Sequence, residues 1–165
     1  MKATTLLRGQ HKQVRDLFKK IENTESPDMR RRLLGRVEGE LSAHTKIEEE
    51  IFYPAVRKLE TRKAEEMVNE AYEEHHVVDL VLNELPQVDP GDERFEAKMT
   101  VLSELVDHHA KEEEKEMFKI AEKIGRAELD DLGRRMEARY RELKGEGRSR
   151  MGVVRSVKRM MGAST

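Results

Sequence analysis

The sequence predicts an all-α protein: an up-down-up-down four-helix bundle with a short fifth C-terminal helix and a basic tail. Charged residues make up 40% of the chain and aromatic residues only 4%, a composition typical of amphipathic helices. Apolar residues also recur at spacings of three and four, as they do along one face of a helix. A length of 165 residues suits one compact domain rather than two.

The first helix is expected over residues 5–23, with an apolar face formed by Leu7, Val14, Phe18 and Ile21. The second should open with Ser26 as its N-cap and Pro27 as its first residue, because a serine oxygen accepts a free N–H and proline lacks one. Its long apolar stripe holds Val37, Leu41, Ile51, Ala55 and Leu59. Pro54 predicts a kink or an early end of this helix.

The third helix is expected to follow Thr61 and to be closed by Pro86. Its apolar face holds Val68, Ala71, Val78, Leu82 and Leu85. After a turn at residues 87–91, a fourth helix should run from about Asp92 to Gly125. Its inner face holds Met99, Leu102, Val106, Met117, Ile120 and Ile124. Because the connections are short, consecutive helices should pack antiparallel.

Three units are expected: the bundle over residues 1–125, an accessory helix over 126–144, and a flexible basic tail over 145–165. The accessory helix should pack on the outside through Leu129, Leu132, Met136 and Leu143. Six basic residues and one acidic residue occur from Lys144 to the end, whereas the rest of the chain is net acidic. The tail could contact an anionic surface or remain a solvated terminus, and no nucleic-acid partner is expected.

The chain contains no cysteine, which excludes disulfides, thiolate zinc sites, iron–sulfur clusters and cysteine nucleophiles. Histidine and carboxylate side chains are then the strong metal ligands. No segment approaches the roughly 18 apolar residues of a transmembrane helix, and no apolar run follows Lys2. We therefore expect a cytoplasmic protein.

Four of the six histidines fall on the apolar faces of the predicted helices. The first and third helices each carry one, and the second and fourth each carry a histidine followed four residues later by an inward glutamate. These six side chains are His11, His44, Glu48, His75, His109 and Glu113. A polar group on an apolar face needs a partner, so these residues are the candidate metal ligands.

The candidate ligands also repeat within the chain. His11 and His44 are 33 residues apart, and His75 and His109 are 34 apart. The stretch HTKIEEEIFYP from His44 aligns without gaps on HAKEEEKEMFK from His109. Two hairpins should therefore present equivalent ligands, so that two glutamates bridge two ions while each ion takes two imidazoles and keeps an open position. Mixed imidazole and carboxylate ligation favours iron, with manganese or zinc as alternatives.

This pattern resembles the hemerythrin-like, or HHE cation-binding, family over roughly residues 6–124. The resemblance rests on His11, HTKIEEEIFYP from His44, EEHHVVDLVL with His75, and HHAKEEEKEMF with His109. It implies two non-heme iron ions, oxo- or hydroxo-bridged, that bind or react with O2, peroxide or NO. In that family pattern the four histidines become terminal ligands, and Glu48 and Glu113 bridge.

One departure from the family concerns Asp79. Oxygen-carrying hemerythrins have a second histidine four residues after the one that corresponds to His75, and Asp79 occupies that position. The departure argues against reversible oxygen carriage and leaves a coordination position open or filled by a carboxylate.

The alternative function is an iron or redox sensor that signals to a partner without turnover. A ferritin-like oxidase would need Glu-x-x-His on two helices, and a metal-free interaction domain would leave six inward polar groups unexplained.

Several neighbouring polar residues are interpreted as surface. His76 and His108 lie out of phase with the ligands, and charge runs typical of a solvated face contain Glu49, Glu50, Glu112 and Glu114. Glu49 or Glu114 would turn inward only if the helix unwound locally. Tyr53 lies nine residues after His44, half a turn out of phase on an ideal helix, and is not counted as a ligand.

Overall fold

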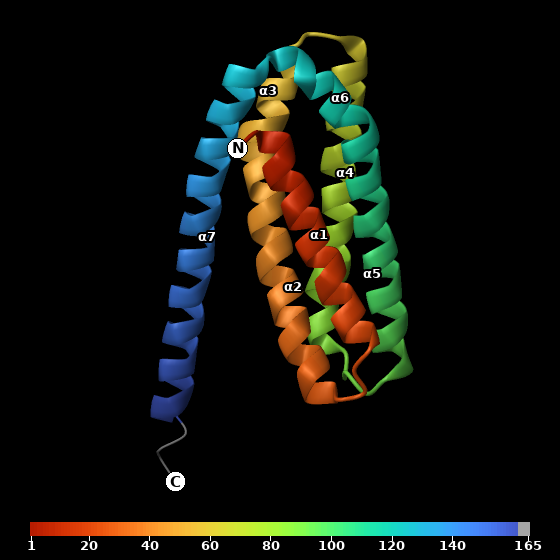
Figure 1. Cartoon of the computed structure of the whole chain (residues 1–165). Helices are drawn as coiled ribbons and strands as arrows, with labels where there is room; N and C mark the ends of the chain where they lie inside the picture. Colours follow the sequence, from red (N-terminus) through yellow and green to blue (C-terminus); the bar gives the residue numbers. More distant parts are fainter. Residues whose placement is uncertain (162–165) are drawn as a thin grey trace.

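Four long helices form the bundle in a computed structural model of the chain. The structure describes the backbone of residues 1–161 and the side chains of residues 1–146. The long helices are α1 (Ala3–Glu22), α2 (Pro27–Ile47), α4 (Arg62–Glu84) and α5 (Glu93–Glu112). Figure 1 shows that successive helices run in opposite directions. No strand occurs within the described backbone, and the predicted up-down-up-down bundle is confirmed.

Three helix starts are encoded by their N-cap residues. The side-chain oxygens of Ser26, Thr61 and Asp92 each accept a hydrogen bond from a backbone N–H in the first turn of α2, α4 and α5. These N–H groups have no acceptor within the helix, so the caps stabilise the starts that the sequence predicted.

None of the helices in the described part of the chain combines the length and apolarity required to cross a bilayer.

The two helices that carry the His-x-x-x-Glu pairs both pass into a π-turn. η1 (Glu48–Phe52) links α2 to α3 (Tyr53–Arg57), and η3 (Glu113–Met117) links α5 to α6 (Phe118–Ala121). A short 3-10 turn, η2 (Leu85–Gln87), follows α4, and another, η4 (Glu122–Ile124), follows α6. Each of the four long helices, together with the short helices that continue it, is called an arm of the bundle. A π-turn contains one residue more than an α-turn, so each chain beyond it is rotated relative to an ideal helix.

This rotation corrects the predicted apolar stripes beyond the π-turns. Ile51, Ala55 and Leu59 are only half-buried, whereas the core positions of the second arm are Phe52, Tyr53 and Val56. The fourth arm changes in the same way, because Phe118 and Ala121 are buried and Ile120 and Ile124 are half-buried. The stripes were wrong because they assumed 3.6 residues per turn throughout.

Pro54 does not end the second arm. It lies at the start of α3, directly after η1. Within η1 the N–H of Tyr53 bonds the carbonyl five residues earlier, so the missing N–H of Pro54 leaves the Glu49 carbonyl free. The Tyr72 hydroxyl donates to that carbonyl over 3.2 Å, which satisfies it from the neighbouring helix.

The core consists of two apolar clusters with a polar layer between them. One cluster includes Leu7, Ile47 and Met117, and the other includes Val14 and Val106. On every arm the predicted ligands fall between members of the two clusters. The fold therefore holds these ligands at one depth of the bundle.

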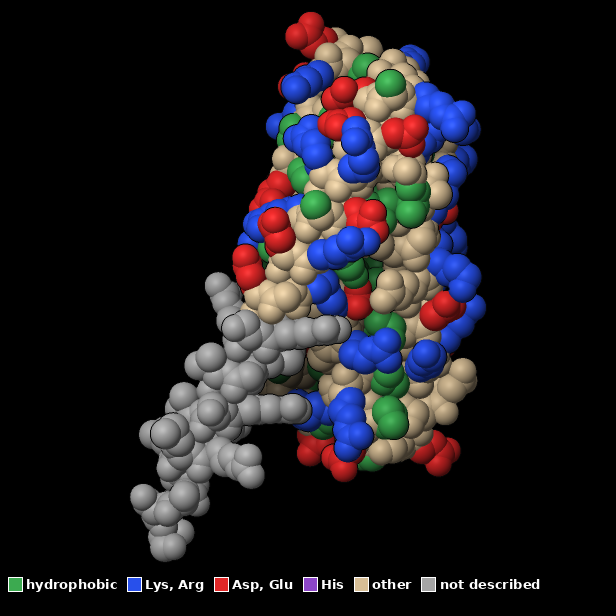
Figure 2. All heavy atoms as spheres, turned by 60° about the vertical axis from the view of Figure 1, so that its left-hand side comes forward, with side chains coloured by type: hydrophobic (Ala, Val, Ile, Leu, Met, Phe, Trp, Pro, Cys, Tyr) green, Lys and Arg blue, Asp and Glu red, His purple; other side chains and the backbone are tan. Residues whose placement is uncertain are grey.

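The fifth helix, α7 (Arg126–Met161), follows Gly125, whose φ of +95° suits only glycine without strain. α7 packs against α1 and α2 (Figure 1). It buries Leu129, Leu132 and Met136, as predicted, whereas Leu143 is only half-buried. Its backbone stays helical to Met161 rather than ending near residue 144, because no proline interrupts this stretch. The side chains of the predicted basic tail from residue 147 onward lie outside the described residues. On the face that carries α7, described Lys and Arg side chains are mixed with Asp and Glu (Figure 2).

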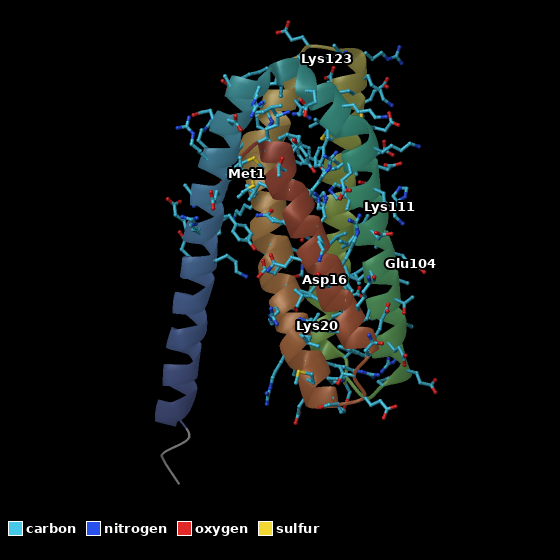
Figure 3. All side chains as sticks on the ribbon, viewed as in Figure 1. Met1, Asp16, Lys20, Glu104, Lys111 and Lys123 are labelled. Atoms are coloured by element: carbon cyan, nitrogen blue, oxygen red, sulfur yellow. The ribbon has the colours of Figure 1, made fainter. Side chains whose placement is uncertain are left out.

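Gly133 of α7 allows the first residues of the chain to pack closely against this helix. Met1 lies beside α7 in Figure 3. A Cβ at residue 133 would lie 2.1 Å from the Met1 carbonyl oxygen and 2.9 Å from the Ala3 nitrogen. We expect Gly133→Ala to lower the free energy of unfolding by about 1–3 kcal/mol, because backbone must move. Denaturant unfolding measures this change.

Gly35→Ala in α2 is the matched control for this prediction. A Cβ at residue 35 would meet no atom within 4 Å. Since alanine favours a helix over glycine, this variant should gain about 0.5–1 kcal/mol. Equal unfolding free energies for the two variants would contradict the close approach.

Candidate metal centre

All six predicted ligands lie in the polar layer of the bundle. The four long helices each contribute one histidine, and Glu48 and Glu113 are the first residues of η1 and η3. Every one of the six is buried. The six side chains that the helix phase placed inside the bundle do lie inside it, although the phase assumed ideal helices.

The ring nitrogens and carboxylate oxygens of these residues approach one another closely. His44 Nε2 lies 3.0 Å from Glu48 Oε1, and His75 Nε2 lies 3.3 Å from Glu48 Oε2. Glu113 Oε2 lies 3.3 Å from His11 Nε2 and 3.8 Å from His109 Nε2. The Nε2 atoms of His75 and His109 are 3.1 Å apart. At these distances, one metal ion could be bound by several of these nitrogen and oxygen atoms at once.

Two overlapping groups of potential ligands result, in each of which the ligand atoms lie within 4.8 Å of one another. The groups are His11, His44, Glu48 and Glu113, and Glu48, His75 and His109. Glu48 belongs to both. Its two oxygens face histidines of different groups, which is the placement that a bridging carboxylate requires.

The outward nitrogen of each ring, Nδ1, is held by a polar side chain. The pairs are His11 with Glu114 (2.8 Å), His44 with Gln10 (2.7 Å), His75 with Glu49 (2.8 Å) and His109 with Glu74 (2.5 Å). An acceptor at Nδ1 selects the tautomer that leaves Nε2 free, and it fixes the direction of the ring. All four imidazoles are thereby oriented to ligate through Nε2.

These partners correct the interpretation of Glu49 and Glu114 as solvated surface. They are the second residues of the two π-turns, so the local unwinding turns both carboxylates toward a histidine. They occupy equivalent positions in the internal repeat, as do Gln10 and Glu74. The sequence does contain a signal for these four residues. In both halves of the repeat, a polar residue directly follows the candidate glutamate, and another directly precedes the first candidate histidine.

Tyr53 also lies at the site, although an ideal helix would place it half a turn away from His44. It is fully buried, and its hydroxyl lies 3.2 Å from His75 Nε2 and 3.5 Å from both Glu48 Oε2 and His109 Nε2. η1 causes this, because the extra residue rotates Tyr53 inward. The equivalent residue in the repeat is Phe118, whose ring lies parallel to that of His11 with centroids 6.2 Å apart. The two halves of the site are therefore chemically unequal.

Asp79 does not take part in the polar layer. Its side chain is exposed on α4, one turn beyond the buried His75. The position where oxygen-carrying hemerythrins have a further histidine therefore supplies no ligand to the groups described above.

The charges of the site oppose the effect of burial on the pKa of Glu48 and of His75. Burial would raise the pKa of Glu48, but His44 and His75 hold it well below its usual range. Burial would likewise lower the pKa of His75, but hydrogen bonds with Glu48 and Glu49 raise it to about 10. Burial raises the pKa of the Tyr53 hydroxyl well above its usual value, and Glu113 and Glu48 act in the same direction. The carboxylate of Glu48 is thus ionised inside the core.

A cation fits this set of side chains. His11 Nε2 and both carboxylate oxygens of Glu113 are buried without a hydrogen-bond partner. Buried polar atoms are almost always paired, and an unpaired buried carboxylate is costly. Ions among the six side chains would satisfy these atoms, and imidazole and carboxylate are donors that iron, manganese and zinc accept.

A cavity of about 20 Å³ adjoins the layer. It is lined by the four histidines and by mostly apolar side chains, among them Val14, Leu41 and Val106. A space of this size holds about one water-sized molecule. The site can therefore admit a very small ligand beside the histidines.

Comparison with known proteins agrees with this geometry. The model of the hemerythrin HHE cation-binding domain matches residues 2–121. The chain therefore belongs to the hemerythrin HHE cation-binding family, and the predicted family is confirmed. The matched residues include the whole polar layer and exclude α7.

Two mycobacterial proteins are similar over nearly their whole length. The uncharacterized protein Rv2633c of Mycobacterium tuberculosis is 30% identical over 151 residues, which cover 88% of this chain and 89% of that protein. The crystal structure of an HHE cation-binding domain-containing protein from Mycobacterium kansasii, a Rv2633c homolog, matches with a TM-score of 0.77 and 27% identity. That match covers 88% of this chain and 89% of the other.

A third relative is much longer. A DNA nickase of Nostoc sp. is 26% identical over 118 residues, which cover 72% of this chain. This chain spans only about a third of the length of that nickase, 33%. The shared part is a segment the size of the bundle.

Proposed function

We propose that the protein holds two non-heme iron ions among His11, His44, Glu48, His75, His109 and Glu113, and there binds or reacts with a small oxidant such as O2, peroxide or NO. The single observation that carries this proposal is the position of Glu48 between two groups of histidines. Imidazole and carboxylate ligation favours iron, with manganese or zinc as alternatives. Bound iron would supply redox chemistry and open coordination positions.

The side chains of the chain itself perform three tasks in this proposal. The four histidines would hold the ions through Nε2 while their Nδ1 partners keep the rings in place. Glu48 would hold both ions through its two oxygens, and Glu113 would hold the ion beside His11 and His44. The negative charges of both carboxylates would balance the cations. The Tyr53 hydroxyl lies beside His75 and can donate a hydrogen bond to a bound small molecule. The cavity of about 20 Å³ restricts that molecule to a few atoms.

The direct test is the metal content and optical spectrum of full-length protein purified without chelator, before and after peroxide, NO or O2 is added. We expect two iron ions per chain and a near-ultraviolet absorption that at least one of these oxidants changes. A folded protein with no bound metal would contradict the proposal, as would a loaded protein whose spectrum none of the three alters.

Tyr53→Phe tests the role of the phenol. We expect the variant to keep both ions, because Tyr53 is not among the six ligands, and to consume peroxide or NO at a rate lower by about 10²-fold. This factor is typical of the loss of a positioned proton donor. Stopped-flow measurement with metal analysis of the same sample checks both parts.

Tyr140→Phe is the matched control, since it also removes one phenol hydroxyl, but that hydroxyl donates to Glu40 outside the site. It should leave the rate unchanged. An unaltered rate in Tyr53→Phe would exclude proton donation, and loss of an ion in that variant would make Tyr53 a ligand instead.

A second candidate function, iron or redox sensing, is favoured by one contact. Arg139 of α7 pairs with Glu50 of η1, with Nε 2.8 Å from Oε2. A change at Glu48 could therefore reach α7, whose altered position a partner would detect. Limited proteolysis with and without iron tests this alternative, which predicts that cleavage changes in α7.

A further inference from the structure

A second set of metal-ligating side chains lies outside the buried layer, between α4 and α5. His108 and Glu112, one turn apart on α5, face Glu74 on α4. His108 Nε2 is 3.6 Å from Glu74 Oε1 and 3.6 Å from Glu112 Oε1. The side chain of His108 is 63% exposed, that of Glu112 46% and that of Glu74 22%. Ions in solution can therefore reach all three.

The spacing of these atoms suits direct coordination of one ion. An ion about 2.1 Å from each ligand separates neighbouring ligands by roughly 3.4 Å at tetrahedral angles. The two separations of 3.6 Å are close to that value, and one ligand atom from each residue lies within 4.8 Å of the others. One imidazole with two carboxylates suits Fe²⁺, Mn²⁺ or Zn²⁺.

The internal repeat shows that this set is specific to one half of the bundle. The equivalent positions in the first half are Gln10, Ala43 and Ile47, which are buried on the helices that α7 packs against. On the second half, Glu104 and Lys111 of α5 point outward on the side away from α7 (Figure 3). A histidine and two acids thus replace an amide and two apolar residues on the half that α7 does not cover.

Glu74 connects this set to the buried centre. Its Oε2 accepts from His109 Nδ1 over 2.5 Å, while its Oε1 faces His108. In the other half a neutral amide, Gln10, orients His44 in the same way. The amide suffices for that task, whereas a carboxylate can also bind a cation through its second oxygen.

We propose that Glu74, His108 and Glu112 form an outer site for a divalent transition-metal ion, joined to the buried centre through the hydrogen bond between Glu74 and His109. Water fills the remaining positions of that ion, so it exchanges with solvent more readily than ions in the core. The outer site is a separate binding function, and it does not require that the buried ions be iron.

Calorimetric titration of the full-length, metal-loaded protein with Zn²⁺ tests the outer site. Wild type is expected to bind one more Zn²⁺ per chain than His108→Ala and than Glu112→Gln. His76→Ala is the matched control, since His76 is also exposed but lies outside the cluster. It should bind as many ions as wild type. Because the result is a difference between variants, it holds whether or not the buried centre contains iron.

Paramagnetic broadening by Mn²⁺ locates the ion in the wild-type protein. The ring signals of His108 should broaden at lower Mn²⁺ concentrations than those of His76. Equal Zn²⁺ counts for wild type and His108→Ala would overturn the proposal. So would equal broadening of the two histidines, which would indicate diffuse attraction to the acidic surface.

Discussion

Glu48→Gln is expected to reduce the metal content from the proposed two ions per chain to one or none. Glu48 is the residue common to both groups of potential ligands, and its two oxygens face His44 and His75. The amide is uncharged, and its nitrogen cannot act as the second oxygen of a bridge. Both ions therefore lose a ligand in this one variant. Elemental analysis of the purified protein measures the loss.

Glu113→Gln provides the comparison for this prediction. Glu113 belongs only to the group that contains His11 and His44, so its replacement should leave at least one ion bound. Circular dichroism should show the same helix content for both variants. Two ions per chain in folded Glu48→Gln would show that Glu48 does not bridge, and greater loss from Glu113→Gln would assign the larger role to Glu113.

Removal of both metal ions by a chelator is expected to lower the melting temperature by about 10–30 °C. Each ion present at 100 to 1,000 times its dissociation constant stabilises the fold by about 3–4 kcal/mol. Loss of 1 kcal/mol lowers Tm by about 2–4 °C in a domain of this size. The physical cause is the layer of buried carboxylates and imidazoles, since Glu113 and His11 otherwise keep unpaired polar atoms in the core.

Scanning calorimetry of one preparation, before chelation, after it and after metal is restored, measures this shift. Restored metal should return Tm to its first value. A melting temperature that does not respond to chelation would show that the ions contribute nothing to the fold. That result would also exclude a sensor that operates through metal-dependent stability.

The six inward side chains could be predicted from the sequence because none of them lies beyond the first residue of an irregular part of its helix. His11 and His75 lie within uninterrupted α-helices, and Glu48 and Glu113 each begin a π-turn. Up to those residues an ideal period of 3.6 holds, so the phase of the apolar stripe places each side chain correctly. Beyond Glu48, the same reasoning failed for Tyr53.

The orienting residues depended on tertiary structure. Glu49 and Glu114 are charged residues in acidic runs, and only the π-turns bring them to His75 and His11. A π-turn results from a choice between hydrogen bonds to the fourth and the fifth preceding residue. That choice depends on the surrounding packing, including the bond from Tyr72 to the Glu49 carbonyl. Periodicity does not contain this information.

The sequence by itself determined the class of fold, the helix starts and the six inward side chains, because caps and hydrophobic phase are local properties. Only the tertiary structure decided that Tyr53 enters the site, that each histidine has an orienting partner, and which half of the bundle α7 covers. Each of these depends on contacts between residues far apart in the chain. Such contacts follow from how the helices pack together, rather than from the period of any one helix.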